Sequence, residues 1–247
     1  MLKKHEEAPE NKRFNTTQWS VVLRACQSGP ELERISWNEL IETYWFPLYA
    51  FCRRQKKSHQ DAQDLTQSFF THLMTAASLD TVSPMKGRFR SFLLASFRNF
   101  IANQIRSAST IQRGGKHQFF SLSANDVEAR FSRGCKWDET PERAFDRNWV
   151  ESLLQRTKDR LLDDYRNAGR QKLFELLEPH LMSDENALSR LEIGKQLNMS
   201  QPAIAMSIHR MRRRYGDILL NEVSRTVEDP ANVEDELRRL MAIVRGE

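Results

Sequence analysis

The feature that most constrains this chain is the segment Leu188–Tyr215, LSRLEIGKQLNMSQPAIAMSIHRMRRRY, which has the pattern of two helices joined by a tight turn. Apolar residues at helical spacing predict the first helix, and Asn198 and Met199 fit the turn. Ser200 is placed to cap the second helix with its hydroxyl, and Pro202 is tolerated in a first helical turn. The segment therefore predicts a helix-turn-helix, whose second helix enters the major groove of duplex DNA.

The second helix of this motif has a basic outer side. Residues 187–216 contain six Lys or Arg and one carboxylate, so the segment has a net charge of +5. Such a helix is suited to contact bases in the groove while its arginines bind the phosphates on either side. The residues expected on or near its outer side are Gln201, Ala205, Ser207, Arg210, Arg212, Arg213 and Arg214. The alternative is an αα-hairpin in a helical bundle with a solvated basic face.

Composition limits the class and compartment of the protein. The 247 residues include 38 Lys and Arg against 33 Asp and Glu, a mild excess whose distribution matters more than its total. Three scattered cysteines do not suffice for a disulfide framework or a zinc site, and we expect no metal and no cofactor. An apolar signal-peptide core and a run of about 18 apolar residues are both lacking. We therefore expect no membrane association and a reducing compartment, which is the cytoplasm or, in a eukaryote, the nucleus.

Apolar residues recur at helical spacing in almost every segment, so we expect an all-α fold. We expect two small helical domains, residues 14–106 and 140–226, of which the second contains the helix-turn-helix. The polar segment 107–139 is expected to be a long flexible linker between them. Residues 227–247 form an acidic amphipathic tail with six acidic and three basic residues. This tail either folds back on a basic surface, docks a regulator or forms a solvated terminal helix.

A second basic region lies between Thr81 and Asn125, where 45 residues contain no Asp or Glu. Such a surface is able to hold a phosphate backbone and to contact unstacked bases. Most of its phenylalanines recur at helical spacing and are expected in the core, which leaves Phe89 as a candidate for stacking on a base. The candidate DNA contacts in this region are Lys86, Arg88, Phe89, Arg90, Asn99 and Asn103.

A helical face just before this region carries Asp61, Asp64 and the amide of Gln67, within DAQDLTQSFF. From its chemistry alone, this is an ordinary solvated face. Paired carboxylates are able to do acid-base work, but no nucleophile, metal-ligand set or phosphate-binding glycine loop accompanies them. We therefore expect that the protein is not an enzyme.

The order of these segments resembles that of a sigma factor of bacterial RNA polymerase. DAQDLTQSFF, a short loop, GRFRSFLLASFRNFIANQIR, a linker and a C-terminal helix-turn-helix are similar to the extracytoplasmic-function (ECF, group IV) type of the sigma-70 superfamily. This type retains only the second and fourth sigma domains. The resemblance covers about Ile35 to Arg225, and HQFFSLSANDVEARF and TPERAFDRNW resemble a subgroup with a longer linker.

The resemblance implies a transcription initiation factor that brings polymerase core to specific promoters. It implies that Asp61, Asp64 and Gln67 dock on the polymerase clamp, and that residues 78–106 read and melt the minus-ten element. The helix-turn-helix is implied to read the minus-thirty-five duplex, capped by Ser200. The residues near its groove are then Gln201, Ala203, Met206, Ser207 and Arg210, with the phosphate clamps Arg212, Arg213 and Arg214.

Two departures from the family pattern affect these implications. Gln63 replaces an acid that is common in the docking motif, which is expected to trim affinity for core. Ala205 and Ser207 stand where many relatives have Lys and Arg, which leaves the base preference undetermined. A stand-alone helix-turn-helix repressor or activator is the alternative function, and an RNA-binding or polymerase-associated scaffold is the third. The expected partners are polymerase core and promoter DNA, with an anti-sigma factor or other regulator left open.

Overall fold

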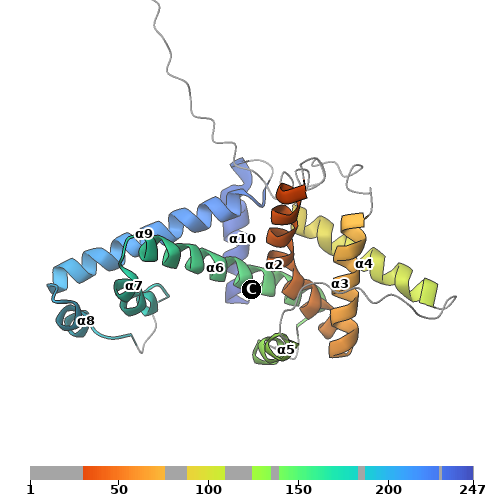
Figure 1. Cartoon of the computed structure of the whole chain (residues 1–247), viewed down its shortest axis with the longest axis horizontal. Helices are drawn as coiled ribbons and strands as arrows, with labels where there is room; N and C mark the ends of the chain where they lie inside the picture. Colours follow the sequence, from red (N-terminus) through yellow and green to blue (C-terminus); the bar gives the residue numbers. More distant parts are fainter. Residues whose placement is uncertain are drawn as a thin grey trace, which may run out of the picture.

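The computed structural model describes residues 30–75, 88–108, 124–134, 139–182, 187–227 and 230–246. All regular elements in these ranges are helices, which confirms the all-α prediction. The long helices α6 and α9 run side by side along much of an elongated molecule (Figure 1). The other helices, except α10, gather at either end of this pair. Residues 14–29 of the predicted first domain lie outside the described ranges.

The helices fall into three groups along the long axis (Figure 1). One end comprises α2 (Pro30–Arg54), α3 (His59–Thr75), α4 (Phe89–Ala108) and α5 (Ala124–Arg133). The other end comprises α7 (Gln171–Leu177), the 3-10 helix η3 (Glu178–His180), α8 (Arg190–Leu197) and the first half of α9 (Gln201–Ser224). The middle comprises α6 (Pro141–Asn167), the second half of α9, the 3-10 helix η4 (Pro230–Asn232) and α10 (Val233–Arg245).

Local signals in the sequence fix the two ends of α6. The Thr140 hydroxyl accepts a hydrogen bond from the backbone N–H of Arg143 at 3.2 Å, and Pro141 occupies the first turn. Gly169 follows the helix with a φ of +68°, a conformation that glycine adopts without steric penalty. The helix between these signals is long enough to contact both ends of the molecule.

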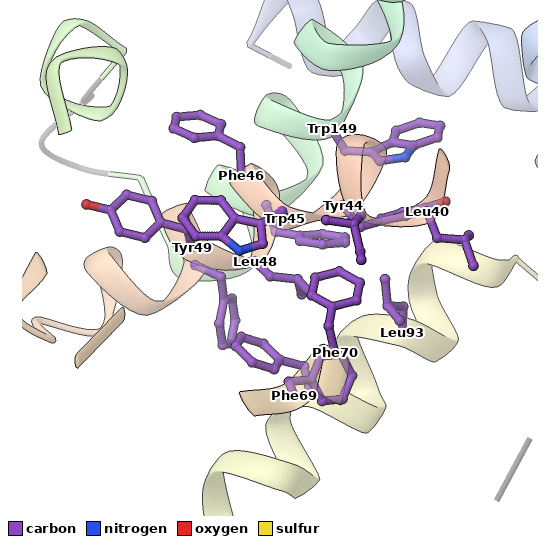
Figure 2. Packing of buried hydrophobic residues seen from close by; sticks show 14 of the residues in the cluster. Leu40, Tyr44, Trp45, Phe46, Leu48, Tyr49, Phe69, Phe70, Leu93 and Trp149 are labelled. Atoms are coloured by element: carbon purple, nitrogen blue, oxygen red, sulfur yellow. The ribbon is translucent and has the colours of Figure 1, made fainter. Parts of the chain in front are cut away.

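The larger core surrounds α2, which buries one aromatic side chain after another. Tyr44, Leu48 and Tyr49 are completely buried in it, against residues of α3, α4 and α6. Figure 2 shows Trp149 of α6 beside Tyr44 of α2. Burying an aromatic side chain removes roughly 150 to 250 Å² from water, so this cluster is the main apolar contribution to stability. Helix α6 is thus part of the same core as α2.

A smaller core lies under the helix-turn-helix at the far end of α6. Its fully buried members come from four helices, and Leu161 is the one that α6 provides. The others are Leu177 of α7, Ile193 of α8, and Ile204 and Met211 of α9. Because α6 contributes to both cores, residues on either side of the predicted boundary at residue 140 pack together. The division into two functional domains therefore stays a prediction.

The segment that the sequence predicted to be a flexible linker contains a packed helix. Helix α5 buries Val127, and its Glu128 carboxylate pairs with Arg53 of α2 at 3.0 Å and accepts a hydrogen bond from the Tyr49 hydroxyl at 2.5 Å. Its Arg130 guanidinium lies 3.8 Å from the centre of the Phe46 ring. The linker prediction is wrong for residues 124–133, because an amphipathic helix with few apolar residues is anchored here by charge and ring contacts.

Glu139 ties the end of this segment to two helices. Its carbonyl accepts hydrogen bonds from the Arg54 guanidinium of α2, at 3.0 Å from Nε and 2.5 Å from Nη2. Its carboxylate binds Arg147 of α6 through two hydrogen bonds, of 2.8 and 2.9 Å. These charge-assisted bonds raise the pKa of Arg147. The start of α6 is therefore fixed on the C-terminal end of α2.

We expect Trp149→Ala to lower the free energy of unfolding by about 3 to 5 kcal/mol, because it removes the largest buried side chain between α6 and α2. Chemical denaturation followed by circular dichroism measures this. Met182→Ala is the control, since that side chain is 65% exposed and its loss is expected to change stability by no more than about 0.5 kcal/mol. Equal stability of the two variants would contradict a shared core.

Candidate nucleic-acid interface

Helices α8 and α9 form a helix, a tight turn and a second helix. Ser189 caps α8 in a capping box with Glu192, whose hydrogen bonds from Ser189 lower its pKa. Asn198 ends α8 in the left-handed conformation, with a φ of 53°. The Ser200 hydroxyl then caps α9 by accepting a hydrogen bond from the N–H of Ala203 at 3.4 Å. Ser200 is thus an N-cap, as the sequence indicated.

Gly194 sets how closely the turn approaches α8. A Cβ atom at this position would lie 2.6 Å from the backbone carbonyl oxygen of Met199, closer than atoms pack. That approach brings Ile193 of α8 and Ile204 of α9 into the same buried core. The angle between the two helices therefore depends on a residue without a side chain.

The first half of α9 presents a row of side chains away from this core. Gln201, Met206 and Arg210 are exposed, and Ala203 is half-buried. Met206 is large, apolar and 56% exposed, which suits contact with a thymine methyl group. Ala203, Met206 and Arg210 therefore share one accessible side of the helix, and Gln201 is exposed in its first turn.

Ser207 differs from its prediction. It is 4% exposed, and its hydroxyl donates a hydrogen bond to the carbonyl of Ala203 at 2.8 Å. The prediction that Ser207 lies at the groove is wrong for this conformation, because a small hydroxyl residue is readily absorbed by its own helix backbone. Arg210 contacts the same hydroxyl at 3.5 Å and extends from there to solvent.

The three predicted phosphate clamps are exposed but differ in their partners. Arg212 donates to the carbonyl of His180 through Nε at 3.0 Å and Nη2 at 2.6 Å. Arg214 pairs with Asp164 of α6 at 2.7 Å. Arg213 is exposed on the same basic stretch. Surface pairs of this kind contribute little to stability, so DNA phosphates are able to replace these partners.

The beginning of α4 does not present the predicted DNA contacts. Phe89 is 3% exposed and packs edge-on against Tyr44, with 5.4 Å between ring centres. Arg90 is 4% exposed, lies 4.7 Å over the Trp149 ring and pairs with Asp146 of α6 and Glu236 of α10. The prediction that Phe89 stacks on a base is wrong for this conformation, and Arg90 faces protein rather than solvent.

The other residues predicted for this region are divided between solvent and protein. Arg88 is partly buried and pairs with Glu236 at 2.5 Å, from Nε to Oε2. Asn99 and Asn103 lie on the exposed side of α4, together with Arg98 and Arg106. Lys86 lies outside the described residues. The outer side of α4 therefore keeps a polar, basic surface to which α4 itself contributes no carboxylate, although Glu142 of α6 pairs with Arg98 at 3.4 Å. The first turn of α4 is covered.

Burial disfavours the protonated, charged state of Arg88 and Arg90. Desolvation lowers the pKa of Arg90 to about 10, and the nearby Asp146 carboxylate opposes this shift. Burial also lowers the pKa of Arg88, with help from the positive charge of Arg239. Both groups remain charged at neutral pH, so each requires an anion beside it.

The predicted docking residues occupy successive turns of α3. Asp61 and Asp64 are exposed and Gln67 is half-buried, on the side opposite to Ala62 and Phe69, which are buried. The Ser58 hydroxyl donates a hydrogen bond to the Asp61 carboxylate at 2.7 Å, which holds this acid at the start of the helix. The three residues thus form one accessible face of α3.

The sequence analysis missed the acids that cover the first turn of α4. Glu236 is fully buried, and Asp146 approaches the same arginine from another helix. The sequence does contain a signal for Glu236, because this acid stands on the apolar side of α10, between Val233 and Leu240. An acid at such a position predicts a buried cation opposite it.

The described residues offer no alternative site for metal chemistry. They contain no group of three or more His, Cys, Asp or Glu side chains arranged to bind a metal ion. In the same part of the chain, no helix combines the length and apolar character needed to cross a membrane.

Comparison with known proteins finds similarity to sigma factors. The model of Sigma-70 region 2 matches residues 40–111, which include most of α2 and all of α3 and α4. The ECF RNA polymerase sigma factor SigE of Mycolicibacterium smegmatis is 24% identical over 201 residues, which cover 81% of this chain and 68% of the relative. No solved structure gives a significant match.

These matches support assignment of the chain to the sigma-70 family, as the order of its motifs predicted. The similarity to SigE supports the extracytoplasmic-function type within this family and a role in polymerase-associated transcription initiation.

We expect Gly194→Ala to destabilise the helix-turn-helix by roughly 1 to 3 kcal/mol, because the new Cβ forces the Met199 carbonyl to move. Duplex binding should weaken in parallel. Gly216→Ala in α9 is the matched control, since a Cβ there meets no atom within 4 Å and alanine is the better helix former by about 1 kcal/mol. Thermal unfolding measures the stability of the two variants, and filter binding measures their affinity for duplex DNA. A Gly194→Ala variant more stable than the unmodified chain would contradict the close contact.

Proposed function

We propose that this protein binds RNA polymerase core and directs it to specific promoters. In this proposal Asp61, Asp64 and Gln67 of α3 dock on polymerase, and the polar side of α4 captures the opened minus-ten strand. The exposed row on α9 reads the minus-thirty-five element as duplex. The observation that carries the proposal is the polar, basic outer side of α4, which lies inside the matched region 2 and at the end of the molecule opposite the helix-turn-helix.

The chemistry of these surfaces supports separate roles for them. Exposed asparagine and arginine side chains on α4 supply hydrogen bonds and positive charge to an unpaired strand, where bases present their polar edges. The basic stretch 210–214 supplies phosphate contacts that position α9 on a duplex. Opening DNA costs a few kcal/mol, so capture of unpaired bases has to accompany duplex anchoring. Two DNA-binding surfaces on one chain meet this requirement.

For docking, we expect Asp64→Arg to weaken binding to polymerase core by at least about tenfold without unfolding the chain. Reversal of a charge in an interface costs several kcal/mol, whereas an exposed reversal changes folding by about 0.5 kcal/mol. Competition for core enzyme on native gels, in the absence of DNA, measures this. Asp217→Arg, an equal charge reversal at an exposed position of α9, is the control. Unchanged binding by a folded Asp64→Arg variant would rule out docking through this face.

For opening, we expect the chain with core enzyme to make minus-ten thymines of a cognate promoter reactive to permanganate, while core enzyme alone does not. Asn99→Ala with Asn103→Ala should lower this reactivity by roughly fivefold or more, because each lost hydrogen bond costs about 1 kcal/mol. Protection of the minus-thirty-five element should change much less.

The matched control replaces two exposed asparagines on other helices, Asn167→Ala with Asn221→Ala. This variant should open the promoter normally. A complex that binds the promoter and never opens it, at any temperature or supercoiling, would instead favour a repressor.

A further inference from the structure

Helix α10 brings a buried acid to the first turn of α4. The Glu236 side chain is completely buried, and its carboxylate pairs with Arg88 at 2.5 Å and with Arg90. Leu240, one turn further along α10, is buried in the larger core and anchors the helix there. The same helix contacts both α6 and α9 (Figure 1). The C-terminal helix therefore holds two arginines of α4 against the body of the protein.

Two acids and an aromatic ring enclose the Arg90 guanidinium. Glu236 approaches from α10, Asp146 from α6 at 3.4 Å, and the Trp149 ring lies 4.7 Å from the guanidinium carbon. A guanidinium binds a carboxylate and a phosphate through the same planar fork of N–H donors. Glu236 therefore supplies to Arg88 and Arg90 the kind of oxygen atoms that a DNA phosphate would supply.

A buried ion pair contributes little net free energy to the packing of a helix. Removing both charges from water offsets most of their attraction, so apolar side chains of similar volume would hold α10 equally well. An ion pair differs from an apolar contact in that a competing anion is able to replace one partner. The contact between α10 and α4 is therefore suited to displacement by a polyanion.

We propose that α10 is an autoinhibitory strap, in which Glu236 occupies the place of a DNA phosphate at Arg88 and Arg90 until promoter DNA displaces it. The proposal rests on the proposed role of α4 in binding the minus-ten strand, and it adds a closed state of the free chain. In that state only the outer side of α4 is accessible. Release of α10 frees the first turn of α4 and changes the contacts of α9, which carries the helix-turn-helix.

The test compares binding of a fluorescein-labelled single-stranded DNA of mixed sequence by variants of the full chain, using fluorescence anisotropy without polymerase. Glu236→Gln removes the competing charge, and Leu240→Ala weakens the apolar anchor without touching a charge. Both variants should bind at least about tenfold more tightly than the unmodified chain, which corresponds to a binding-competent fraction of about one tenth or less in that chain. Adding Arg88→Ala to Glu236→Gln should remove most of this gain.

Glu234→Gln is the matched control, because it removes one charge from an exposed position of the same helix. It should change DNA affinity by no more than about twofold. Thermal unfolding identifies folded variants, and Leu240→Ala decides the question if Glu236→Gln does not fold. No gain in affinity in a folded variant, or an equal gain in Glu234→Gln, would overturn the strap.

Promoter opening by the unmodified chain with core enzyme separates this inference from the proposed function. Opening without any gain in Glu236→Gln and Leu240→Ala would overturn the strap and leave the promoter function intact. A gain without opening would support the strap and remove the promoter function.

Discussion

The packing of Trp149 on Tyr44 is the contact on which the rest of the structure depends (Figure 2). It fixes α6 on α2, and α6 in turn supplies Leu161 to the second core under the helix-turn-helix. The same indole ring receives the Arg90 guanidinium, so the position of α4 is set from this point as well. One aromatic contact thus relates the helices at both ends of the molecule to a common helix.

Charged side chains, rather than aromatic ones, form contacts of the C-terminal part of α9 and the residue after it with α6 and α2. Glu222 of α9 is almost completely buried and pairs with Arg160 and, at 3.4 Å, with Arg156 of α6, while Arg225 reaches Glu39 of α2 at 2.6 Å. Intact buried pairs contribute little net stability, whereas loss of one partner costs about 3 to 5 kcal/mol. These pairs therefore select one register of α9 on α6 more than they stabilise the fold.

Local signals made much of the fold predictable from the sequence. Helical spacing gave the all-α class, and Ser200 marked the start of α9. Contacts between distant segments were not predictable in this way. Phe89 and Arg90 look like DNA contacts in a carboxylate-free segment, because the acid that neutralises Arg90 lies in α10, far along the chain. Helix α5 was missed because its anchors, such as Glu128 on Tyr49, are polar and long-range. Ser207 was misplaced because its hydroxyl bonds to its own helix.

The anchoring of α5 and Glu139 bears on promoter geometry. A fully extended segment 107–139 would span roughly 110 Å and tolerate almost any distance between two DNA elements. With α5 held on α2 by Glu128, only six residues, 135–140, separate the end of the described segment 124–134 from α6, and a chain of six residues reaches at most about 20 Å. Glu139 shortens it further by joining Arg54 to Arg147. Under the proposed function, folded helices rather than a flexible chain set the spacing between the two promoter elements, so one inserted base pair changes both the distance and the helical phase that the protein has to match.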